Sequence, residues 1–474
     1  MPTLLLFPRG TPWRACLRTI VMGTMACWAT ACLGADGLPA AFDAALTRAR
    51  VPRDAVSVVL AEAQPNGASI WSHRAQVAMN PASVMKLVTT YAALDQLGPA
   101  FTWTTPVYVE GAVRDGTLTG RLWIQGQGDP HLVLERLWLL LRRVQHSLGV
   151  ERIVGDIVLD STAFAPSPTQ PGDFDGEPLS AYNAAPDALL INFKSVLLTL
   201  TPDPAQGVAH LQWDPPLAGV QMPRTVALAS GECGDYRAAL KADFTDPLRF
   251  RLLGTYAAAC KEKTWPFAYV DPASYAARAV QGLWQSMGGQ LQGSVRLGAL
   301  PAQASSWQPA LVARSAPLAE IVRDINKYSN NVMAQQLFLT LGRPATGASA
   351  DLPGARTALL NWWQQRLGPA DPPALDNGSG LSRSERISAQ ALVRLLQAAY
   401  ASTLMPELMN SLPIYGVDGT LRRAPQAVGG GAHLKTGSLA DVTALGGYVH
   451  AANGKRYVLV AIVNHPNARA ARAA

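Results

Sequence analysis

The chain has 474 residues, of which 49% are hydrophobic and 15% are charged. This composition excludes an intrinsically disordered protein, and the length predicts two or three domains rather than one. The net charge is +7, but basic residues do not cluster in runs interleaved with aromatic residues. We therefore predict no nucleic-acid-binding site.

The first 35 residues have the pattern of a secretory signal peptide. Three arginines within the first 18 residues precede an apolar stretch over residues 19–33, and small residues follow it. This stretch is short for a permanent membrane span, and no later segment is long enough. We expect an exported, periplasmic protein with no stable membrane span after signal removal; a buried N-terminal helix is the alternative. Lipid attachment at Cys32 stays open, although the usual aliphatic residue three positions before it is absent.

Only two cysteines, Cys233 and Cys260, lie in the body of the chain, since the other three lie in or beside the predicted signal. In an exported chain such a pair suggests one disulfide, and two buried free thiols are the alternative. The two residues are 27 positions apart, so closing this loop would stabilise the fold by roughly 3 kcal/mol.

Strand and helix patterns alternate after the signal, over residues 36–103. Residues 56–72 predict two strands around a tight turn that contains Asn-Gly. A helical run then begins near Ser83, which Pro81 precedes, and it stops at Gly98. Helices often have proline at their start and glycine just past their end. We therefore predict that Ser83 lies in the first turn of a helix.

The sequence pattern changes over residues 104–303, which we predict to form β-rich inserted domains. Short strands are separated by Gly, Pro and Asp, beginning with a hairpin over residues 107–124. One helix is expected, at residues 132–144.

Helical periodicity returns within residues 304–474 and then gives way to strands. A helix that begins near Leu318 breaks at residues 326–329 and resumes to Leu341. An Ala/Arg run at the C-terminus resembles the start of a final helix. The remaining expected elements are helices near 355–367 and 388–401 and strands at 443–450 and 457–463.

The first of three short motifs pairs Ser83 with Lys86. Helical residues three apart share a face, so the lysine can reach the serine hydroxyl. A serine hydroxyl needs a base to take its proton, and a lysine becomes that base when burial or a nearby cation lowers its pKa from ~10.4. No other lysine of the chain has a serine three positions before it. Taken alone, the pattern also fits a helix-capping serine beside a solvated lysine.

The second motif is Ser329-Asn330-Asn331, at the predicted break between two helices. Short polar side chains at such a break can point into a cleft, where Ser329 could relay a proton and Asn331 could bind a substrate amide. Taken alone, the motif also fits ordinary helix capping.

The third motif is Lys435-Thr436-Gly437-Ser438, just before the final hairpin. A strand edge offers backbone N–H groups to an oxyanion, and a lysine offers a point charge to a substrate carboxylate. Gly437 lets a substrate approach the backbone closely. Taken alone, the motif also fits a polar turn leading into a strand.

The order of the three motifs is that of the penicillin-recognising serine enzymes. The gap of 243 residues from Lys86 to Ser329 is much longer than in β-lactamases or simpler carboxypeptidases. In these features the chain resembles the D-alanyl-D-alanine carboxypeptidases of the penicillin-binding protein 4 type, peptidase family S13. Other segments that look like this family are Gly126–Pro130, Gly155–Asp160, Tyr182–Ala184 and Asp376–Arg383.

The resemblance implies an α/β (α+β) fold class. A β-lactamase/transpeptidase-like domain, with an antiparallel sheet and helices, would be formed by residues 36–103 and 304–474, and the β-rich domains at 104–303 would be inserted into it. The resemblance also places a disulfide at Cys233 and Cys260, where such proteins often carry one.

The resemblance further implies the roles of the site residues. Ser83 would attack the penultimate D-Ala carbonyl of a peptidoglycan stem peptide, with Lys86 as base. Ser329 and Lys435 would pass the proton to the leaving D-Ala, and Asn331 would orient the substrate. Thr436 and Lys435 would hold the terminal carboxylate, and the backbone N–H groups of Ser83 and Ser438 would form the oxyanion hole.

The expected enzyme is therefore a serine-type D-Ala-D-Ala carboxypeptidase, with D,D-endopeptidase activity also conceivable, and β-lactam antibiotics are expected to bind it. No cofactor is expected, and no His/Cys/Asp/Glu spacing indicates a metal site. No Gly-x-Ser-x-Gly pentapeptide occurs, so a Ser-His-Asp triad fits poorly. The alternatives are a β-lactamase or esterase of the same fold and a catalytically inactive peptidoglycan-binding protein.

Overall fold

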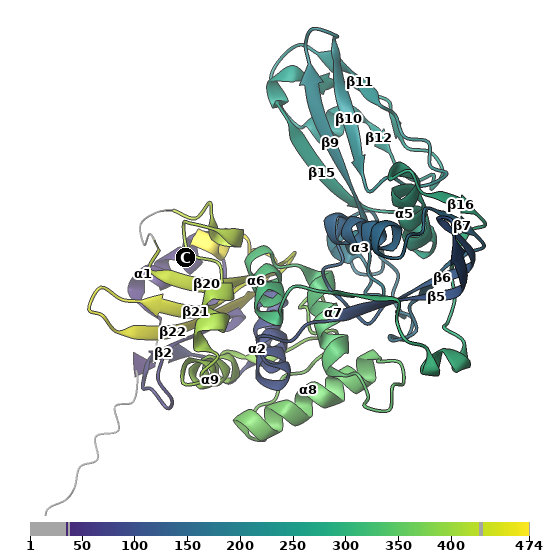
Figure 1. Cartoon of the computed structure of the whole chain (residues 1–474). Coiled ribbons are helices and arrows are strands. Elements are labelled where there is room, and N and C mark those ends of the chain that lie inside the picture. The colour runs from purple at the N-terminus through teal and green to yellow at the C-terminus, as the bar shows by residue number, and fades with distance from the viewer. Residues whose placement is uncertain (1–34, 37, 426–429, 474) are drawn as a thin grey trace, which may run out of the picture. The chain divides into compact units, whose positions relative to one another are not determined.

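The structure is a computed structural model that describes residues 35–36, 38–425 and 430–473 (Figure 1). The predicted signal peptide, with Cys32, lies outside the described residues apart from its last position. Within the described ranges no helix combines the length and the apolar character needed to cross a membrane.

A six-stranded sheet joins the two ends of the described chain. Its strand order is β1-β3-β2-β22-β21-β20, and all pairs except β1–β3 are antiparallel. The early strand β2 is paired with the late strand β22 along its whole length, and β20 forms one edge. The strands are β1 Ala35–Asp36, β2 Val56–Glu62, β3 Ser69–His73, β20 Ala432–Leu439, β21 Val442–His450 and β22 Arg456–Asn464.

Both faces of this sheet are covered, because successive strand residues point to opposite sides. On one face Val59 and Val460 pack in the large core formed with the helices. On the other face Val56 and Val463 pack against α1 and the short C-terminal turn Ala470–Ala473. The helices are α1 Ala40–Ala49, α2 Lys86–Leu97, α6 Leu318–Tyr328, α7 Asn331–Leu341, α8 Leu352–Leu367, α9 Ala389–Tyr400 and α10 Met405–Ser411.

The helices and strands expected in these segments are present, and their ends differ from the expected ones by a few residues. The break between α6 and α7 is present but shorter and later than predicted: it falls at Ser329 and Asn330 rather than at residues 326–329, because α6 continues through Tyr328. Two helices, α1 and α10, were not predicted. A two-stranded pair, β4 Ala78–Met79 with β19 Ile387–Ser388, was also not predicted.

The intervening segment forms a seven-stranded and a five-stranded sheet that share one hydrophobic core. The hairpin expected at 107–124 is β5 and β6, and the expected helix is α3. A second long helix, α5, contradicts the prediction of a single helix here. The elements are β5 Thr104–Arg114, β6 Thr117–Gln125, α3 Leu134–Ser147, β7 Arg152–Val154, β8 Ile157–Asp160, β9 Ser195–Asp203, β10 Val208–Asp214, β11 Thr225–Ala229, α4 Tyr236–Leu240, β12 Ala242–Asp243, β13 Arg251–Leu252, β14 Tyr256–Ala257, β15 Lys263–Ala268, α5 Pro272–Ser286, β16 Gln290–Gln292, β17 Val295–Leu297 and β18 Leu311–Arg314.

The missed helix α5 did carry a sequence signal. Pro272 stands in its first turn, and buried Tyr275, Ala279 and Leu283 recur every four residues along one face. The division of the chain at residues 103 and 303 stays a prediction. The strand β18 pairs with β5, so the inserted sheet extends to Arg314.

The predicted disulfide between Cys233 and Cys260 is present, with the two Cα atoms 4.5 Å apart. It ties the loop before α4 to the turn after β14, at the border of the core of the inserted segment. None of the residues of the three motifs lies in the loop that it closes.

We expect the double substitution Cys233→Ser/Cys260→Ser to destabilise the protein by about 3–4 kcal/mol, because the unfolded chain regains the freedom of a 27-residue loop. Denaturant unfolding measures this change. The rate of acylation by a fluorescent penicillin should stay within about twofold of the parent, and two free thiols in the non-reduced parent protein would contradict the bond.

Candidate active site

Ser83 lies in a short 3₁₀ turn, Ala82–Met85, that leads directly into α2. Ala82 takes the left-handed conformation with φ of 47°, which costs energy for a residue with a Cβ atom. The side chain of Asn80 holds this turn. Its Oδ1 accepts the Ala82 N–H at 2.8 Å, and its Nδ2 donates to the Ser382 carbonyl at 2.9 Å. The serine is therefore presented by a backbone that its surroundings keep in place.

Two glycines allow neighbouring segments to close on this turn. A Cβ atom at Gly437 would lie 2.4 Å from the Pro81 carbonyl oxygen and 3.2 Å from the Ser83 nitrogen. A Cβ atom at Gly380, whose φ is 78°, would lie 1.9 Å from the Ala82 carbonyl oxygen. Strand β20 and the loop around Gly380 thus touch the serine turn through backbone atoms, which is why no larger residue fits there.

Lys86 is fully buried, and its Nζ lies within hydrogen-bonding distance of three oxygens. These are Ser83 Oγ at 2.9 Å, Asn331 Oδ1 at 2.7 Å and the Ser379 carbonyl at 2.5 Å. Burial lowers the pKa of Lys86 well below its ordinary value, and the charge of Lys435 lowers it further, against an opposing effect of Glu385. The neutral form of this amine is therefore favoured far more than in an exposed lysine.

A neutral amine has two N–H bonds and one lone pair. It can therefore donate hydrogen bonds to two of its three neighbours and accept one from the third. The Ser379 carbonyl only accepts hydrogen bonds. Asn331 presents Oδ1 to Lys86, because its Nδ2 donates to the Tyr182 carbonyl at 3.2 Å. The two N–H groups go to these acceptors, and the lone pair is left for the Ser83 hydroxyl. This is the arrangement of a general base with its nucleophile.

The second and third motifs meet at Lys435. Its Nζ donates to Ser329 Oγ at 2.9 Å and to the Thr436 carbonyl at 2.8 Å. Ser329 can occupy the break between α6 and α7 because it adopts the left-handed conformation, with φ of 58°. Lys435 is fully buried, and burial lowers its pKa to about 7. This cation is therefore close to losing its proton at neutral pH.

The register of β20 directs two N–H groups of the third motif to its open edge. The His450 N–H donates to the Gly431 carbonyl, and bonded pairs alternate in an antiparallel ladder. Lys435 and Gly437 therefore bond to β21, whereas Thr436 and Ser438 point their N–H groups away from it. The edge can thus donate hydrogen bonds to a bound group.

The side chains of Thr436 and Ser438 have partners outside the strand. Thr436 Oγ1 lies 2.8 Å from Thr420 Oγ1, and Ser438 Oγ accepts a hydrogen bond from Arg472. Thr420 belongs to a loop fixed by the ion pair of Lys327 with Asp418, whose N–O distance is 2.6 Å. Thr420, Arg472 and this ion pair were not predicted from the sequence.

Several further contributors to the site also escaped sequence analysis. Asn464, at the end of β22, bonds in both directions with the backbone of Asn80, at 2.8 and 2.9 Å. The carbonyls of Ser379 and Tyr182 complete the surroundings of Lys86 and Asn331. Both lie in segments that had been noted for their likeness to the family, so a signal existed, but it assigned no role.

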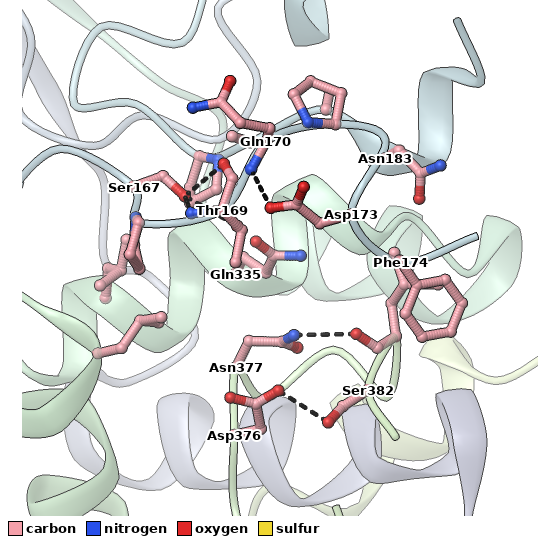
Figure 2. A pocket seen from close by; sticks show the side chains of 18 of the residues that line it. Ser167, Thr169, Gln170, Asp173, Phe174, Asn183, Gln335, Asp376, Asn377 and Ser382 are labelled. Carbon is pink, nitrogen blue, oxygen red and sulfur yellow. Dashed lines mark hydrogen bonds between the residues drawn. The ribbon is translucent and has the colours of Figure 1, made fainter. Parts of the chain in front are cut away.

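A cavity of about 400 Å³ adjoins these segments (Figure 2). Its walls come from residues within 165–186 of the inserted segment, from α7, from the start of α8 and from residues within 376–383. Two of the lining residues lie close in sequence to the groups around Lys86. Asn183 is next to Tyr182, whose carbonyl accepts from Asn331, and Asn377 lies two residues before Ser379, whose carbonyl accepts from Lys86. Figure 2 shows Asp376 bonded to Ser382 in its wall, at 2.7 Å.

Metal ligands are not grouped anywhere in the part of the chain that the structure describes: no three His, Cys, Asp or Glu side chains are placed to hold one ion.

Comparison with known proteins assigns the chain to a family. Residues 38–474 match the D-Ala-D-Ala carboxypeptidase 3 (S13) family. The chain belongs to this family. The resemblance inferred from the three motifs is therefore confirmed, and so is the enzyme class, a serine-type D-alanyl-D-alanine carboxypeptidase.

Relatives and solved structures agree with this assignment. The D-alanyl-D-alanine carboxypeptidase of Actinomadura sp. (strain R39) is 29% identical over 87% of this chain and 78% of its own length. The D-alanyl-D-alanine carboxypeptidase DacB of Haemophilus influenzae is 28% identical over 81% of this chain and 80% of its own. The crystal structure of penicillin binding protein 4 (dacB) from H. influenzae aligns with a TM-score of 0.70 at 24% identity, covering 90% of this chain and 93% of that one. This last likeness confirms the predicted fold class.

We expect Lys86→Ala to lower the acylation rate of Ser83 by at least about 100-fold, because the serine loses its base. The measurement is the second-order rate constant with a fluorescent penicillin, with thermal melting to verify folding. Lys455→Ala, which removes an exposed lysine paired with Glu62, is the matched control and should acylate normally. Normal acylation by Lys86→Ala would refute the general-base assignment.

The depressed pKa of Lys435 predicts an alkaline limit to activity. Above a pH of about 7 the free enzyme loses this positive charge, so it should bind substrates with a carboxylate less well. We expect kcat/KM for an acyl-D-Ala-D-Ala peptide to fall as pH rises through this value. An activated ester that has no carboxylate is the control and should lack the fall. The same alkaline limb for both substrates would show that Lys435 is not its source.

Proposed function

We propose that this enzyme removes the terminal D-Ala of peptidoglycan stem peptides through an acyl-enzyme on Ser83. The observation that carries the proposal is the buried amine of Lys86, which lies 2.9 Å from Ser83 Oγ and contacts two further acceptors, Asn331 Oδ1 and the Ser379 carbonyl. This geometry, with the lowered pKa of the amine, supports Lys86 as the base for the serine hydroxyl.

In the acylation step, Lys86 takes the proton of Ser83 as Oγ attacks the carbonyl carbon of the penultimate D-Ala. The carbonyl oxygen becomes an oxyanion, which the N–H groups of Ser83 and Ser438 stabilise. One such donor is typically worth about 3–4 kcal/mol in the transition state. The outward direction of the Ser438 N–H from β20 and the contact of Gly437 with the serine turn support this assignment.

Collapse of the intermediate breaks the bond to the terminal D-Ala, whose nitrogen must gain a proton. Ser329 and Lys435, 2.9 Å apart, supply the path for that proton. Thr436 and Lys435 hold the terminal carboxylate, and Asn331 orients the substrate amide in addition to holding Lys86. Water then attacks the ester on Ser83, which releases the shortened peptide and restores the serine.

The cavity beside residues 376–383 supports a substrate longer than D-Ala-D-Ala, because it offers about 400 Å³ next to the segments that hold Lys86 and Asn331. We include cleavage of D-Ala–diaminopimelate crosslinks in the proposal as a second, endopeptidase activity. The arginines and apolar stretch of residues 1–35 support export to the periplasm, where this polymer lies.

Two rival functions make different predictions about the same serine. A β-lactamase would hydrolyse the acyl-enzyme rapidly, with a glutamate that activates water. The Glu-x-x-Leu-Asn pattern of the best-known β-lactamase class is absent, since Glu407-Leu408-Met409-Asn410 has the wrong spacing. An inactive binding protein would not need the depressed pKa of Lys86.

We expect penicillin to form a long-lived ester on Ser83, because the opened ring stays tethered where D-Ala would depart and blocks the approach of water. Deacylation should be far slower than the typical enzyme turnover of ~10 per second. Mass spectrometry after incubation should find one adduct, on the peptide that contains Ser83, and Ser83→Ala should form none. Rapid turnover of a chromogenic β-lactam without an adduct would indicate a β-lactamase, and no reaction at all an inactive binding protein.

A further inference from the structure

Glu385 is a buried acid to which the reaction described above assigns no part. Its side chain is inaccessible to solvent, and it lies between residues 376–383 and strand β19. Its Oε1 accepts three consecutive backbone N–H groups, from Asp376 at 3.1 Å, Asn377 at 3.1 Å and Gly378 at 2.8 Å. Its Oε2 has no hydrogen-bond partner among the described residues. A buried carboxylate is costly, so its presence calls for an explanation.

The backbone that Glu385 binds leads directly to the catalytic lysine. Gly378, the last of the three donors, precedes Ser379, whose carbonyl accepts from Lys86 Nζ at 2.5 Å. The Gly378 carbonyl accepts from Thr89 Oγ1 at 2.7 Å, which ties the same turn to α2. Gly380 then contacts the Ala82 carbonyl of the serine turn. A shift of this loop would move one of the two acceptors that direct the lone pair of Lys86.

We propose that Glu385 is a positioning residue: it holds the Ser379 carbonyl against Lys86 and places a buried carboxyl group under the loop that contacts that lysine. The proposal rests on the proposed function of Lys86 as the base for Ser83. Because a nearby negative charge favours the protonated amine, the carboxylate offsets part of the effect that burial and Lys435 have on the pKa of Lys86. Glu385 thereby limits how weak a base the lysine becomes.

The ion pair of Asp376 with Arg356 lies near Glu385. Burial has the largest effect on Glu385 and raises its pKa, and the three backbone N–H groups, which favour the charged form, offset only part of that rise. Asp376 raises the pKa of Glu385 further, although Arg356 binds Asp376 from α8 at 2.8 Å and Ser382 donates to its second oxygen. Because the carboxylate cannot reach solvent, it cannot activate a hydrolytic water, which distinguishes it from the deacylating glutamate of β-lactamases.

The first test is Glu385→Gln, which keeps an oxygen acceptor for the loop but removes the charge. We expect the acidic limb of the acylation rate against pH to move to lower pH by at least about half a unit, because Lys86 then loses its proton more easily. Thermal melting verifies the fold, and Glu320→Gln, at an exposed glutamate of α6, is the control. An unmoved acidic limb would overturn the electrostatic part of the proposal.

The second test is Glu385→Asp, which keeps the charge but withdraws the carboxylate by one methylene. The acylation rate should fall at least about tenfold at all pH values, while the acidic limb stays near its original pH. Normal acylation by this variant would overturn the positioning part.

A direct readout separates this proposal from the proposed function. With eight lysines in the chain, ¹⁵N-lysine NMR can follow the titration of the Lys86 amine, assigned by its loss in Lys86→Ala. The Lys86 pKa should drop in Glu385→Gln even if Ser83 were not the nucleophile. An unchanged Lys86 titration would refute the effect of Glu385, whereas failure of Ser83 to acylate in the parent protein would refute only the proposed function.

Discussion

The amine of Lys86 lies in the interior of the protein, where a charge costs several kcal/mol. Burial and the charge of Lys435 reduce this cost by lowering the pKa of the amine, which favours its neutral form, and Asn331 Oδ1 and the Ser379 carbonyl accept hydrogen bonds from it. Other groups of the site keep these two acceptors in place. Tyr182 sets the orientation of the Asn331 amide, and Glu385 holds the loop that carries Ser379. These groups come from three separate parts of the chain, so the surroundings of Lys86 exist only in the folded protein.

Sequence analysis predicted the local structure around Ser83, Lys86 and Lys435, because that structure depends on residue type and short spacing. Ser83 and Lys86 lie three residues apart at a helix start, and Lys435 lies on a strand, so local structure alone orients them. The pairing of Ser329 with Lys435, at 2.9 Å, brings together residues 106 positions apart. It could be inferred only through the order of the motifs in the family, not through periodicity.

The parts that sequence analysis missed are mostly backbone groups and long-range contacts. Every residue has a carbonyl, so nothing in the sequence distinguishes those of Ser379 and Tyr182 as partners of the site. Glu385 reads as an ordinary polar residue in a loop until its burial is known. The helix α5 was missed for another reason: its apolar residues stand among short strands, whose Gly and Pro punctuation dominated the prediction.

The hydrogen bonds between Asn80 and Asn464 have a consequence for how the protein folds during its synthesis. They join residues 384 positions apart, and the pairing of β2 with β22 is just as distant in sequence. Contacts between residues so distant in sequence close long loops, which slows folding. A growing chain already contains Ser83 and Lys86 long before β22 exists to hold the turn that presents them. The protein therefore acquires its reactive serine late, after the whole inserted segment has been synthesised.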